Sequence, residues 1–378
     1  MTSFPTSDSL KIAMLGTRGI PATYSGFETF VEQLSTRLVD RGHDVTVFNR
    51  YPFVPSRARV YRGVRIVSLR TLQRKSLDTP VHTLLSTLYL PFIQPDVAYF
   101  CGVGNAVFCL VPRLLGIPCI INVDAEDWAR GKWSGFARWW LRKSEGWAAR
   151  LADVVIADSN VISTRYKARF GREAVYIPYG SNISLEPRGT ATLDKWGLQP
   201  RRYILFCGRM VPENRADLLI RVFKDIVAPD IKLAIVGDAP YSEDLQRELR
   251  ALADDRVVFT GYAFGDAYAE LSRNCIFFVL TSGVEGTRPV LLDQMGFGNC
   301  VLVRGSAANT EVVGDAGLTF DDGSEFESLK ERIEYLLGHR EAVGDYRRRA
   351  VERVSARYDW ERVTDQYVEL FRSLVRDQ

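Results

Sequence analysis

Short apolar runs alternate with longer segments whose apolar residues recur every three or four positions along most of the 378-residue chain. Runs of four or five apolar residues predict buried strands, and recurrence at three or four positions predicts helices that bury one face. Strand and helix signals that alternate in this way are typical of parallel sheets with helices on both faces. The pattern therefore predicts an α/β protein.

The first half of the chain contains one series of these signals. The predicted strands are residues 11–15, 45–48, 97–100, 119–123, 154–157 and 175–177. A helix is predicted over residues 26–41, whose apolar side chains share one face. Ser25 and Glu28 have the spacing of a capping box, and Gly42 is typical of the residue that follows a helix.

The second half repeats the alternation after a polar stretch that contains Gly and Pro. That stretch, residues 181–200, is predicted to be a linker between a domain of residues 1–180 and a domain of residues 201–359. The predicted strands are 203–207, 232–236, 257–260, 276–280 and 301–303, and the predicted helices are 215–226, 242–253 and 290–297. Residues 324–378 read as helical, with a last helix near 360–375.

Composition narrows the class of protein. A hydrophobic content of 46% and a charged content of 25% suit two ordinary soluble domains, and a net charge of +3 does not indicate a nucleic-acid partner. The six cysteines include no C-x-x-C pair, so reduced thiols in the cytoplasm are expected. No signal peptide or membrane span is predicted, and three unclustered histidines do not predict a zinc site.

The segment with the most chemical information is residues 285–293, Glu-Gly-Thr-Arg-Pro-Val-Leu-Leu-Asp. It follows an apolar run and opens a predicted helix, and Pro289 suits a first helical turn. N–H groups at such a helix start, here those of Gly286, Thr287 and Arg288, are expected to attract phosphate. Glu285 and Asp293 flank this cradle, so the segment predicts a sugar-nucleotide site.

A second group of candidate residues follows other strand ends. Arg209 comes directly after strand 203–207, where open parallel sheets bind ligands, and its guanidinium suits two phosphate oxygens. Gly237 and the pair Gly261-Tyr262 follow strands 232–236 and 257–260 in the same way.

These motifs resemble those of the retaining glycosyltransferases of family 4, which have the GT-B fold. Residues 285–293 are similar to the family's Glu-x7-Glu signature, and residues 208–214 are similar to its Gly-Arg-x-x-x-Glu-Lys pattern. The chain departs from the family at Asp293 and Asn214, and Arg215 or Arg288 would have to supply the missing positive charge.

The resemblance implies two Rossmann-like domains that face each other across a cleft, with a last helix (360–378) that crosses back to the first domain. It also implies that Arg209 and Asn214 hold the diphosphate, that Asp293 holds the ribose and Glu285 the donor sugar, and that the base lies near Gly261 and Tyr262. The family normally works without a metal ion, so no cofactor or metal is expected.

The start of the chain adds a narrower resemblance. Residues 16–28 lack the G-x-G-x-x-G fingerprint of dinucleotide-binding proteins, but they resemble a bacterial rhamnosyltransferase-like branch of family 4. Gly16 and Gly19 would let backbone approach the donor. The branch implies deoxythymidine-diphosphate-rhamnose as the donor, and a uridine- or guanosine-diphosphate hexose stays open.

Acceptor residues are expected in the first domain. Tyr24, Phe27 and Glu28 lie at the start of the first helix, and Asp124 stands where many family members have a histidine, so it is expected to point at the reacting sugar or the acceptor hydroxyl. His82 is a further acceptor candidate, and a buried structural role is its alternative. The expected acceptor is a saccharide or a lipid-linked molecule.

Two further segments of the chain are rich in basic residues. Residues 128–147 contain five tryptophans among arginines and lysines, which predicts either packing into the first domain, the favoured interpretation, or contact with an anionic membrane surface. Residues 57–75 are also basic and are expected to form a flexible loop beside the acceptor cleft. A nucleotide-sugar 2-epimerase and a non-catalytic binding protein are the alternative functions.

Overall fold

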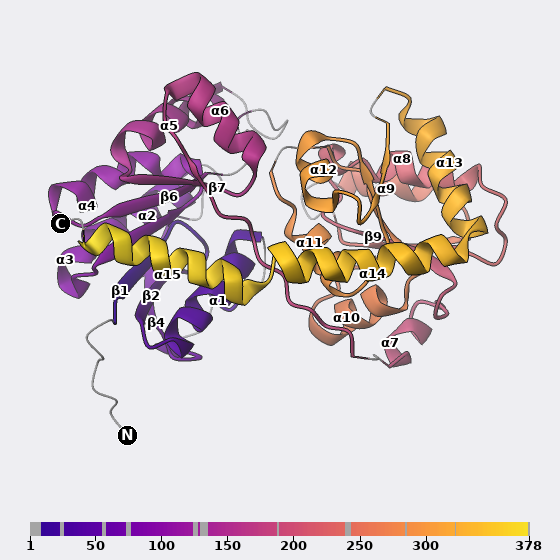
Figure 1. The fold of residues 1–378 in the computed structure, drawn as a ribbon, viewed down its shortest axis with the longest axis horizontal. Helices are drawn as coiled ribbons and strands as arrows, with labels where there is room; N and C mark the ends of the chain where they lie inside the picture. Colours follow the sequence, from indigo (N-terminus) through magenta and orange to yellow (C-terminus); the bar gives the residue numbers. More distant parts are fainter. Residues whose placement is uncertain are drawn as a thin grey trace. The chain divides into compact units, whose positions relative to one another are not determined.

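A computed structural model describes residues 9–22, 26–54, 58–72, 77–123, 128, 135–186, 189–238, 243–283, 286–321 and 323–376. The chain forms two compact units, one of residues 1–180 with 360–378 and one of residues 181–359 (Figure 1). Each unit is built around its own largely parallel sheet, which confirms the predicted α/β fold class.

The sheet of the first unit has eight strands within the described ranges. In spatial order they are β3 (Val60–Tyr61), β4 (Val64–Arg70), β2 (Asp44–Tyr51), β1 (Lys11–Leu15), β5 (Val97–Cys101), β6 (Cys119–Val123), β7 (Val154–Ala157) and β8 (Val175–Tyr176). All neighbours are parallel except β3 and β4. The central strands are apolar and buried, as expected for a sheet covered on both faces.

Helices connect these strands. They are α1 (Gly26–Asp40), α2 (Asp78–Leu88), α3 (Leu90–Ile93), the 3-10 helix η1 (Val103–Cys109), α4 (Leu110–Leu114), α5 (Gly135–Leu151), α6 (Asn160–Phe170) and α15 (Trp360–Arg376). Strand order reverses direction at β1, so right-handed connections put α1 on one face of the sheet and α2, η1, α4 and α5 on the other. Gly42, with φ of 87°, follows the end of α1 as predicted.

The prediction of a flexible loop over residues 57–75 is wrong for most of that segment. Residues 60–61 and 64–70 form β3 and β4, and β4 pairs with β2 over six residues. Val64 and Ile66 are buried while Arg65 and Arg70 face outward, so a period of two was present in the sequence. The basic residues of its outer face concealed this strand.

The sheet of the second unit has six described strands, all parallel. In spatial order they are β11 (Val257–Gly261), β10 (Lys232–Val236), β9 (Tyr203–Cys207), β12 (Phe278–Leu280), β13 (Val301–Arg304) and β14 (Leu318–Phe320). The helices are α7 (Ala191–Asp194), the 3-10 helix η3 (Pro212–Asn214), α8 (Ala216–Lys224), α9 (Glu243–Leu252), α10 (Gly265–Asn274), α11 (Pro289–Gly296), α12 (Ala307–Val313), α13 (Glu325–Gly338) and α14 (Arg340–Arg357).

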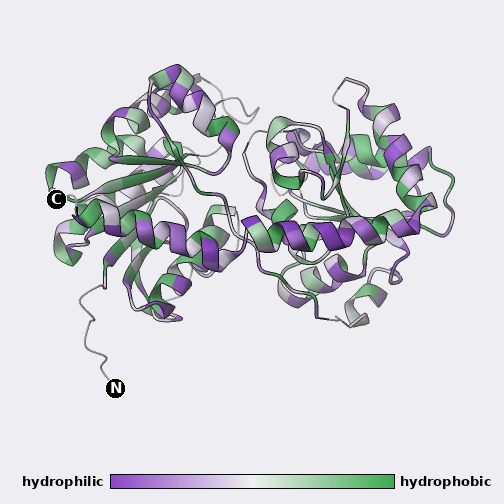
Figure 2. Cartoon of the chain, viewed as in Figure 1, coloured by the Kyte–Doolittle hydropathy of each residue, from purple (hydrophilic) through white to green (hydrophobic). Residues whose placement is uncertain are grey.

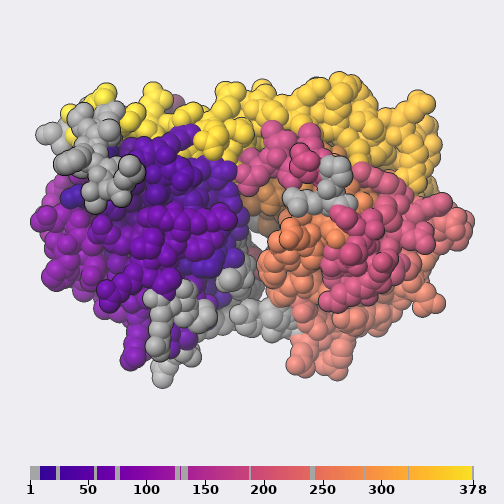
Figure 3. All heavy atoms as spheres, turned by 90° about the horizontal axis from the view of Figure 1, so that it is seen from below, coloured from indigo at the N-terminus to yellow at the C-terminus, as the bar shows by residue number. Residues whose placement is uncertain are grey.

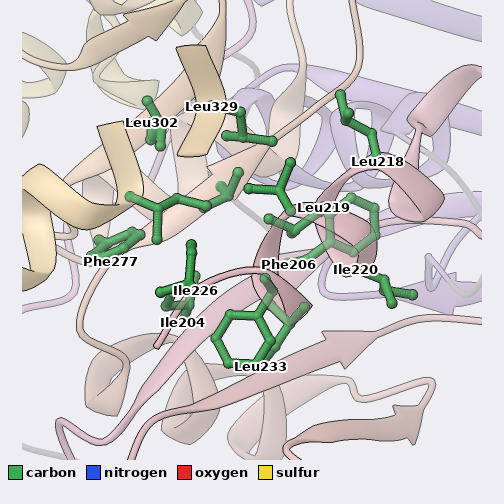
Figure 4. Close-up of a cluster of buried hydrophobic side chains, with 14 of the residues drawn as sticks. Ile204, Phe206, Leu218, Leu219, Ile220, Ile226, Leu233, Phe277, Leu302 and Leu329 are labelled. Carbon is green, nitrogen blue, oxygen red and sulfur yellow. The ribbon is translucent and has the colours of Figure 1, made fainter. Parts of the chain in front are cut away.

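The core of the second unit lies between this sheet and α8 and α13. Phe206 on β9, Leu233 on β10 and Leu302 on β13 are fully buried, and Leu219 and Leu329 reach them from the two helices (Figure 4). Side chains of this size contribute roughly 1.5–3 kcal/mol each when they are removed from water. The core therefore holds strands β9 and β12 rigidly, and the loops at their carboxyl ends start from fixed points.

Residues 181–200, expected to be a linker, are packed into the second unit. They contain α7, and Leu193 and Leu198 are buried. The carboxylate of Glu270 on α10 accepts the N–H groups of Thr192 at 2.6 Å and Leu193 at 3.0 Å, which satisfies donors at the start of α7. A polar segment with two anchoring leucines is thus part of the domain.

The helix α15 belongs to the first unit. Its buried residues recur at helical spacing (Trp360, Val363, Thr364, Tyr367, Val368 and Phe371), and Figure 2 shows apolar and polar positions alternating around it. Trp360 lies 5.9 Å from the Phe30 ring of α1, and the hydroxyls of Tyr367 and Tyr99 are 3.3 Å apart. Figure 3 shows the yellow atoms of α15 against the indigo atoms of α1.

The chain enters the second unit at Ser181 and leaves it at Asp359, and these two crossings are joined. The Ser181 N–H donates to the Tyr358 carbonyl at 2.6 Å, and Ser181 forms a bridge with Asp359. In the first unit, Gly180 touches Trp360 so closely that a Cβ added to Gly180 would lie 2.3 Å from the Cδ2 atom of Trp360.

Within the described ranges, no helix is both long and apolar enough to span a bilayer.

Candidate functional site

The candidate site is the carboxyl edge of the second sheet, where the chain leaves β9, β10 and β12. The Gly208 N–H donates to Val236 at 2.9 Å and the Met210 N–H donates to Asp238 at 3.0 Å, so the loops after β9 and β10 lie side by side. Gly237 has φ of 133°, and a Cβ there would lie 1.9 Å from the Gly208 carbonyl oxygen. Only glycine fits at this contact.

Arg209 and Asn214 belong to one turn whose shape the Asn214 side chain maintains. The Asn214 Nδ2 donates to the Arg209 carbonyl at 2.7 Å, and the Asn214 carbonyl accepts the Thr281 hydroxyl at 2.6 Å. The guanidinium of Arg209 makes no hydrogen bond or ion pair with any residue that the structure describes. Its charge therefore stays available for a ligand, whereas the Asn214 amide is already engaged.

The structure gives Arg215 and Arg288 other partners than a phosphate. Arg215 lies 2.9 Å from Glu325 and 3.6 Å from Asp217, and Glu325 also binds Arg304. Arg288 donates to the Ser282 hydroxyl at 2.8 Å. The idea that Arg215 replaces the family's lysine is therefore not favoured by these contacts, because two carboxylates neutralise it.

The helix α11 begins as the sequence predicts. Arg288 is its N-cap residue, Pro289 is in its first turn, and the Leu291 N–H is the first to bond within the turn, to Arg288 at 2.9 Å. Gly286, with φ of 96°, and the buried Thr287 precede it. The N–H groups before Leu291 are thus at a helix start, where an anion binds favourably.

Asp293 lies one turn into α11, close to the end of β9. Burial raises the pKa of its carboxyl group to about 7. Burial and then Asp293 itself raise the pKa of the Cys207 thiol to about 12, so the two groups are neighbours. The Asp293 carboxylate has no hydrogen-bond partner among the described residues, so a ligand hydroxyl could supply one.

Gly261 and Tyr262 lie at the end of β11, beside β10. The Gly237 N–H donates to the Gly261 carbonyl at 2.9 Å. Tyr262 is exposed and stacks on the exposed Phe264, with ring centroids 5.8 Å apart and planes 20° apart. Phe264 was missed by the sequence analysis, and its only signal was an exposed aromatic residue shortly after a strand. The two stacked rings form a flat apolar surface.

In the first unit, Gly16 and Gly19 are explained by the protein's own packing. A Cβ on Gly16 would lie 2.6 Å from the Cys101 carbonyl oxygen, and one on Gly19 would lie 2.1 Å from Oδ1 of Asn49. Both have positive φ. The sequence attributed these glycines to a close donor, but the close neighbours that the structure describes are β5 for Gly16 and β2 for Gly19.

Glu28 and His82, expected at the acceptor, are buried. The Glu28 carboxylate accepts the Arg18 N–H at 2.9 Å, which stabilises the loop after β1. The Nε2 atom of His82 lies 3.1 Å from the Asn49 carbonyl, and burial and then Arg50 lower the pKa of His82 to about 4. The burial of His82 argues against direct contact with an acceptor and fits the alternative of a buried structural histidine.

Of the four remaining expected residues, the structure describes one. Phe27 is partly buried at the start of α1, near Gly102. Tyr24, Asp124 and Glu285 lie outside the described residues. Among the described residues no cluster of His, Cys, Asp or Glu could hold a metal ion.

Comparison with known proteins places this chain in a family. Residues 25–180 match the family model described as glycosyl transferase 4-like domain, and residues 201–339 match glycosyl transferases group 1. The chain is 30% identical, over 91% of its length and 92% of the other protein, to a GDP-mannose-dependent alpha-(1-6)-phosphatidylinositol monomannoside mannosyltransferase of Mycolicibacterium smegmatis. It is 23% identical to the sulfoquinovosyl transferase SQD2 of Arabidopsis thaliana, over 91% of this chain and 69% of that protein.

A solved structure extends the likeness in fold. Sucrose-phosphate synthase from Thermosynechococcus elongatus matches with a TM-score of 0.82 and 19% identity over 98% of this chain and all of that chain. The protein belongs to the family 4 glycosyltransferases, which have the two-domain GT-B fold. It is therefore an enzyme that transfers a sugar from a nucleotide-sugar donor.

Proposed function

We propose that the enzyme transfers a hexose from a nucleoside-diphosphate sugar, with retention at the anomeric carbon and without a metal ion, to a hydroxyl of a saccharide or lipid-linked acceptor. One contact carries this proposal. The bond from the Thr281 hydroxyl to the Asn214 carbonyl joins the turn after β9, which holds Arg209, to the chain that leads into α11. A diphosphate between them would meet a guanidinium and a helix N-terminus together.

The proposed chemistry depends on charge that develops as the bond to the diphosphate breaks. Arg209 and the amides of Gly286 and Thr287 would stabilise the departing diphosphate, and this positive charge takes the place of a metal ion. Asp293 would accept hydrogen bonds from the ribose. The acceptor hydroxyl would attack from the face that the diphosphate leaves, and a phosphate oxygen would take its proton. Glu285, outside the described residues, is proposed to hold the donor sugar.

The donor is proposed on two different grounds. The resemblance of residues 16–28 supports deoxythymidine-diphosphate-rhamnose, whereas the relative at 30% identity is named as GDP-mannose-dependent. A thermal-shift panel of sugar nucleotides decides between them. The preferred donor should stabilise the protein by about 2.7 kcal/mol at a hundredfold excess over its Kd.

Product analysis separates the proposal from the two alternatives. Transferase activity releases nucleoside diphosphate only when an acceptor is present. An epimerase would instead convert the donor to a free epimeric sugar nucleotide, and a non-catalytic protein would bind donor without turnover across an acceptor panel. The name of the mannosyltransferase relative supports including phosphatidylinositol mannosides among the acceptors.

The Arg209→Ala variant tests the site directly. We expect kcat/KM to fall by a factor that corresponds to about 2–4 kcal/mol, because one charge-stabilising donor is lost. Arg221→Ala removes an exposed arginine of α8 in the same unit and should leave turnover unchanged. Near-normal turnover of a correctly folded Arg209→Ala enzyme would contradict the assignment.

A further inference from the structure

The first unit exposes an apolar surface that its fold does not cover. On α2, α3 and α4 and in the residues next to them, large apolar side chains point to solvent, and Phe92 and Leu114 are 79% and 77% exposed. The full set is Leu84, Leu85, Leu88, Tyr89, Phe92, Leu110, Leu114 and Leu115, called here the α2–α4 surface. Single exposed leucines are ordinary, but a set on adjacent helices marks an interaction site.

These helices are neighbours, so the surface is continuous. The helix α2 contacts both α3 and α4, and η1 contacts α2, α4 and α5. The rings of Tyr89 and Phe92 lie 5.5 Å apart. Arg113 of α4 donates to the Arg150 carbonyl at 3.1 Å, which joins α4 to the end of α5.

The exposed charges within α2, α3, α4 and α5 have one sign. Within α2, α3 and α4, all of which the structure describes, Arg113 is the exposed charged residue, because Asp78 is largely buried against Arg50 at 2.9 Å. The exposed charged residues of α5 are Arg138, Arg142, Lys143 and Arg150. Its single acid, Glu145, is buried between Arg165 and Arg169.

The helix α5 also has exposed aromatic side chains. Phe136 is 72% exposed and packs 5.5 Å from the exposed Trp139. Trp140 and Trp147 are partly buried, and the Trp140 Nε1 donates to the Gly104 carbonyl at 3.1 Å. The tryptophan-rich segment thus divides: some indoles pack into the unit, as favoured from the sequence, while one indole and a phenyl ring face solvent among basic side chains.

We propose that the α2–α4 surface and the basic, aromatic face of α5 form a docking surface for an anionic phospholipid bilayer. Leucine and phenylalanine side chains bury in the boundary between headgroups and acyl chains, and an indole lies at that level. Lysine and arginine side chains near the membrane surface are attracted to anionic lipid. The enzyme would bind the membrane peripherally through its first unit.

The charge pattern favours a bilayer over a second copy of the chain. A twofold symmetric dimer brings the same surface of both copies together. The four exposed cations of α5 would then meet a copy of the same surface, which has no exposed acid on α2, α3, α4 or α5 to pair with them. Anionic lipid supplies the opposite charge and an apolar layer at once.

Vesicle flotation of the full-length protein tests the proposal. Vesicles of phosphatidylcholine alone and of phosphatidylcholine with phosphatidylglycerol are compared without donor or acceptor. We expect binding to the anionic vesicles, with weaker binding at about 1 M salt than at about 0.1 M, because the Debye length falls from about 10 Å to about 3 Å. The Phe92→Glu/Leu114→Glu double variant should bind about tenfold more weakly.

Matched variants separate the two parts of the surface. Arg142→Glu/Lys143→Glu should remove the preference for anionic lipid. Val227→Glu, at a valine that is 95% exposed in the second unit, places the same new charge elsewhere and should leave binding unchanged. Melting curves establish that each variant is folded.

Three outcomes would overturn the proposal. They are no binding of wild type to anionic vesicles, equal loss of binding in Val227→Glu, and a concentration-dependent dimer that Leu114→Glu abolishes. Each is independent of sugar transfer, since turnover with a water-soluble acceptor is measured on the same preparations. Loss of that turnover with intact vesicle binding would count against the proposed function alone.

Discussion

Asp293 carries a carboxyl group in a position where it is partly protonated near neutral pH. Its pKa is about 7 because burial disfavours the charged form. Cys207, its neighbour at the end of β9, is a neutral thiol whose own pKa is raised to about 12. An acid without a partner among the described residues is destabilising when ionised, which is typical of a side chain retained for a ligand.

This shift makes a prediction about stability and pH. The pKa of Asp293 in the folded protein exceeds the ordinary aspartate value of 3.8, so the folded protein holds a proton that the unfolded chain releases, and stability falls as pH rises from about 4 to about 7. Asp293→Asn removes this loss and should be more stable than wild type at pH 8, by about 4 kcal/mol at most, and equal to it near pH 4. Chemical denaturation across this range measures the difference, and parallel curves would contradict it.

Gly237 gives a prediction about backbone contact. Its positive φ would strain any other residue, and the Gly208 carbonyl leaves no room for a Cβ. We expect Gly237→Ala to lower donor affinity and to destabilise the second unit, since its Cβ would displace the loop that carries Arg209. Gly116→Ala is the control, with φ of 70° and no atom within 4 Å of the added Cβ. The control should cost about 1–2 kcal/mol for positive φ alone. Equal effects in unfolding and donor titrations would argue against the close contact.

Side-chain roles could be predicted only where backbone chemistry dictates them. The start of α11 followed from Pro289 and from the run of residues before it. The engagement of Asn214 by the Arg209 carbonyl and the burial of His82 could not be predicted, because each depends on a partner distant in sequence or on a turn. Thr281 was likewise missed, since a threonine after a strand has no distinctive spacing.

At the scale of elements, Glu325 links the regions around the proposed phosphate site. It lies at the start of α13, 2.9 Å from Arg215, and it also binds Arg304 of β13. The side chain of Arg304 also lies against Gly283, since a Cβ added to Gly283 would be 2.8 Å from the Cδ atom of Arg304. One carboxylate therefore connects the turn after β9 with the chain just before α11.

We expect Glu325→Gln to loosen both regions, because two arginines then lack their shared negative charge. Donor Kd should rise about tenfold and stability should fall by about 1–3 kcal/mol. Glu331→Gln, on an exposed position of the same helix, is the matched control. Calorimetric titration with the preferred nucleotide measures the affinity, and an unchanged Kd in a destabilised variant would reduce Glu325 to a purely structural role.

Elements were predictable where one residue pattern dominated. Strands 11–15, 119–123, 154–157, 203–207 and 232–236 were predicted with the bounds that the structure has, because each contains at least three consecutive apolar residues. Strand β4 was missed because arginines alternate with its buried residues. The packing of residues 181–200 was missed because Leu193 and Leu198 are isolated in a polar segment, and Glu270, which anchors α7, comes much later in the chain.

At the scale of the molecule, α15 completes the first unit through aromatic packing. Trp360, Tyr367 and Phe371 meet Phe30 and Tyr99 in one buried cluster. Arg37 of α1 and Arg41, the residue that follows α1, bind Glu361 of α15 at 2.9 and 2.8 Å on the surface above the cluster. The apolar cluster contributes most of this attachment, since exposed ion pairs are worth about 1 kcal/mol or less.

Replacement of Trp360 tests this attachment. We expect Trp360→Ala to cost about 3–5 kcal/mol, because a large buried side chain leaves a cavity against Phe30 and Gly180. Glu361→Ala should cost less than about 1 kcal/mol. Thermal unfolding followed by hydrogen exchange locates the loss, which should concentrate in the first unit, and a loss confined to the second unit would contradict the assignment of α15.

The place of α15 in the first unit also orders events during synthesis on the ribosome. Residues 360–376 are translated after all of the second unit, so the amino-terminal sheet must wait with Phe30 and Tyr99 uncovered until translation has passed residue 376. At about 5–20 residues per second, the intervening stretch takes on the order of ten seconds or more. Chains that end at Asp359 and have been released from the ribosome should therefore contain a protease-resistant second unit and a protease-sensitive first one.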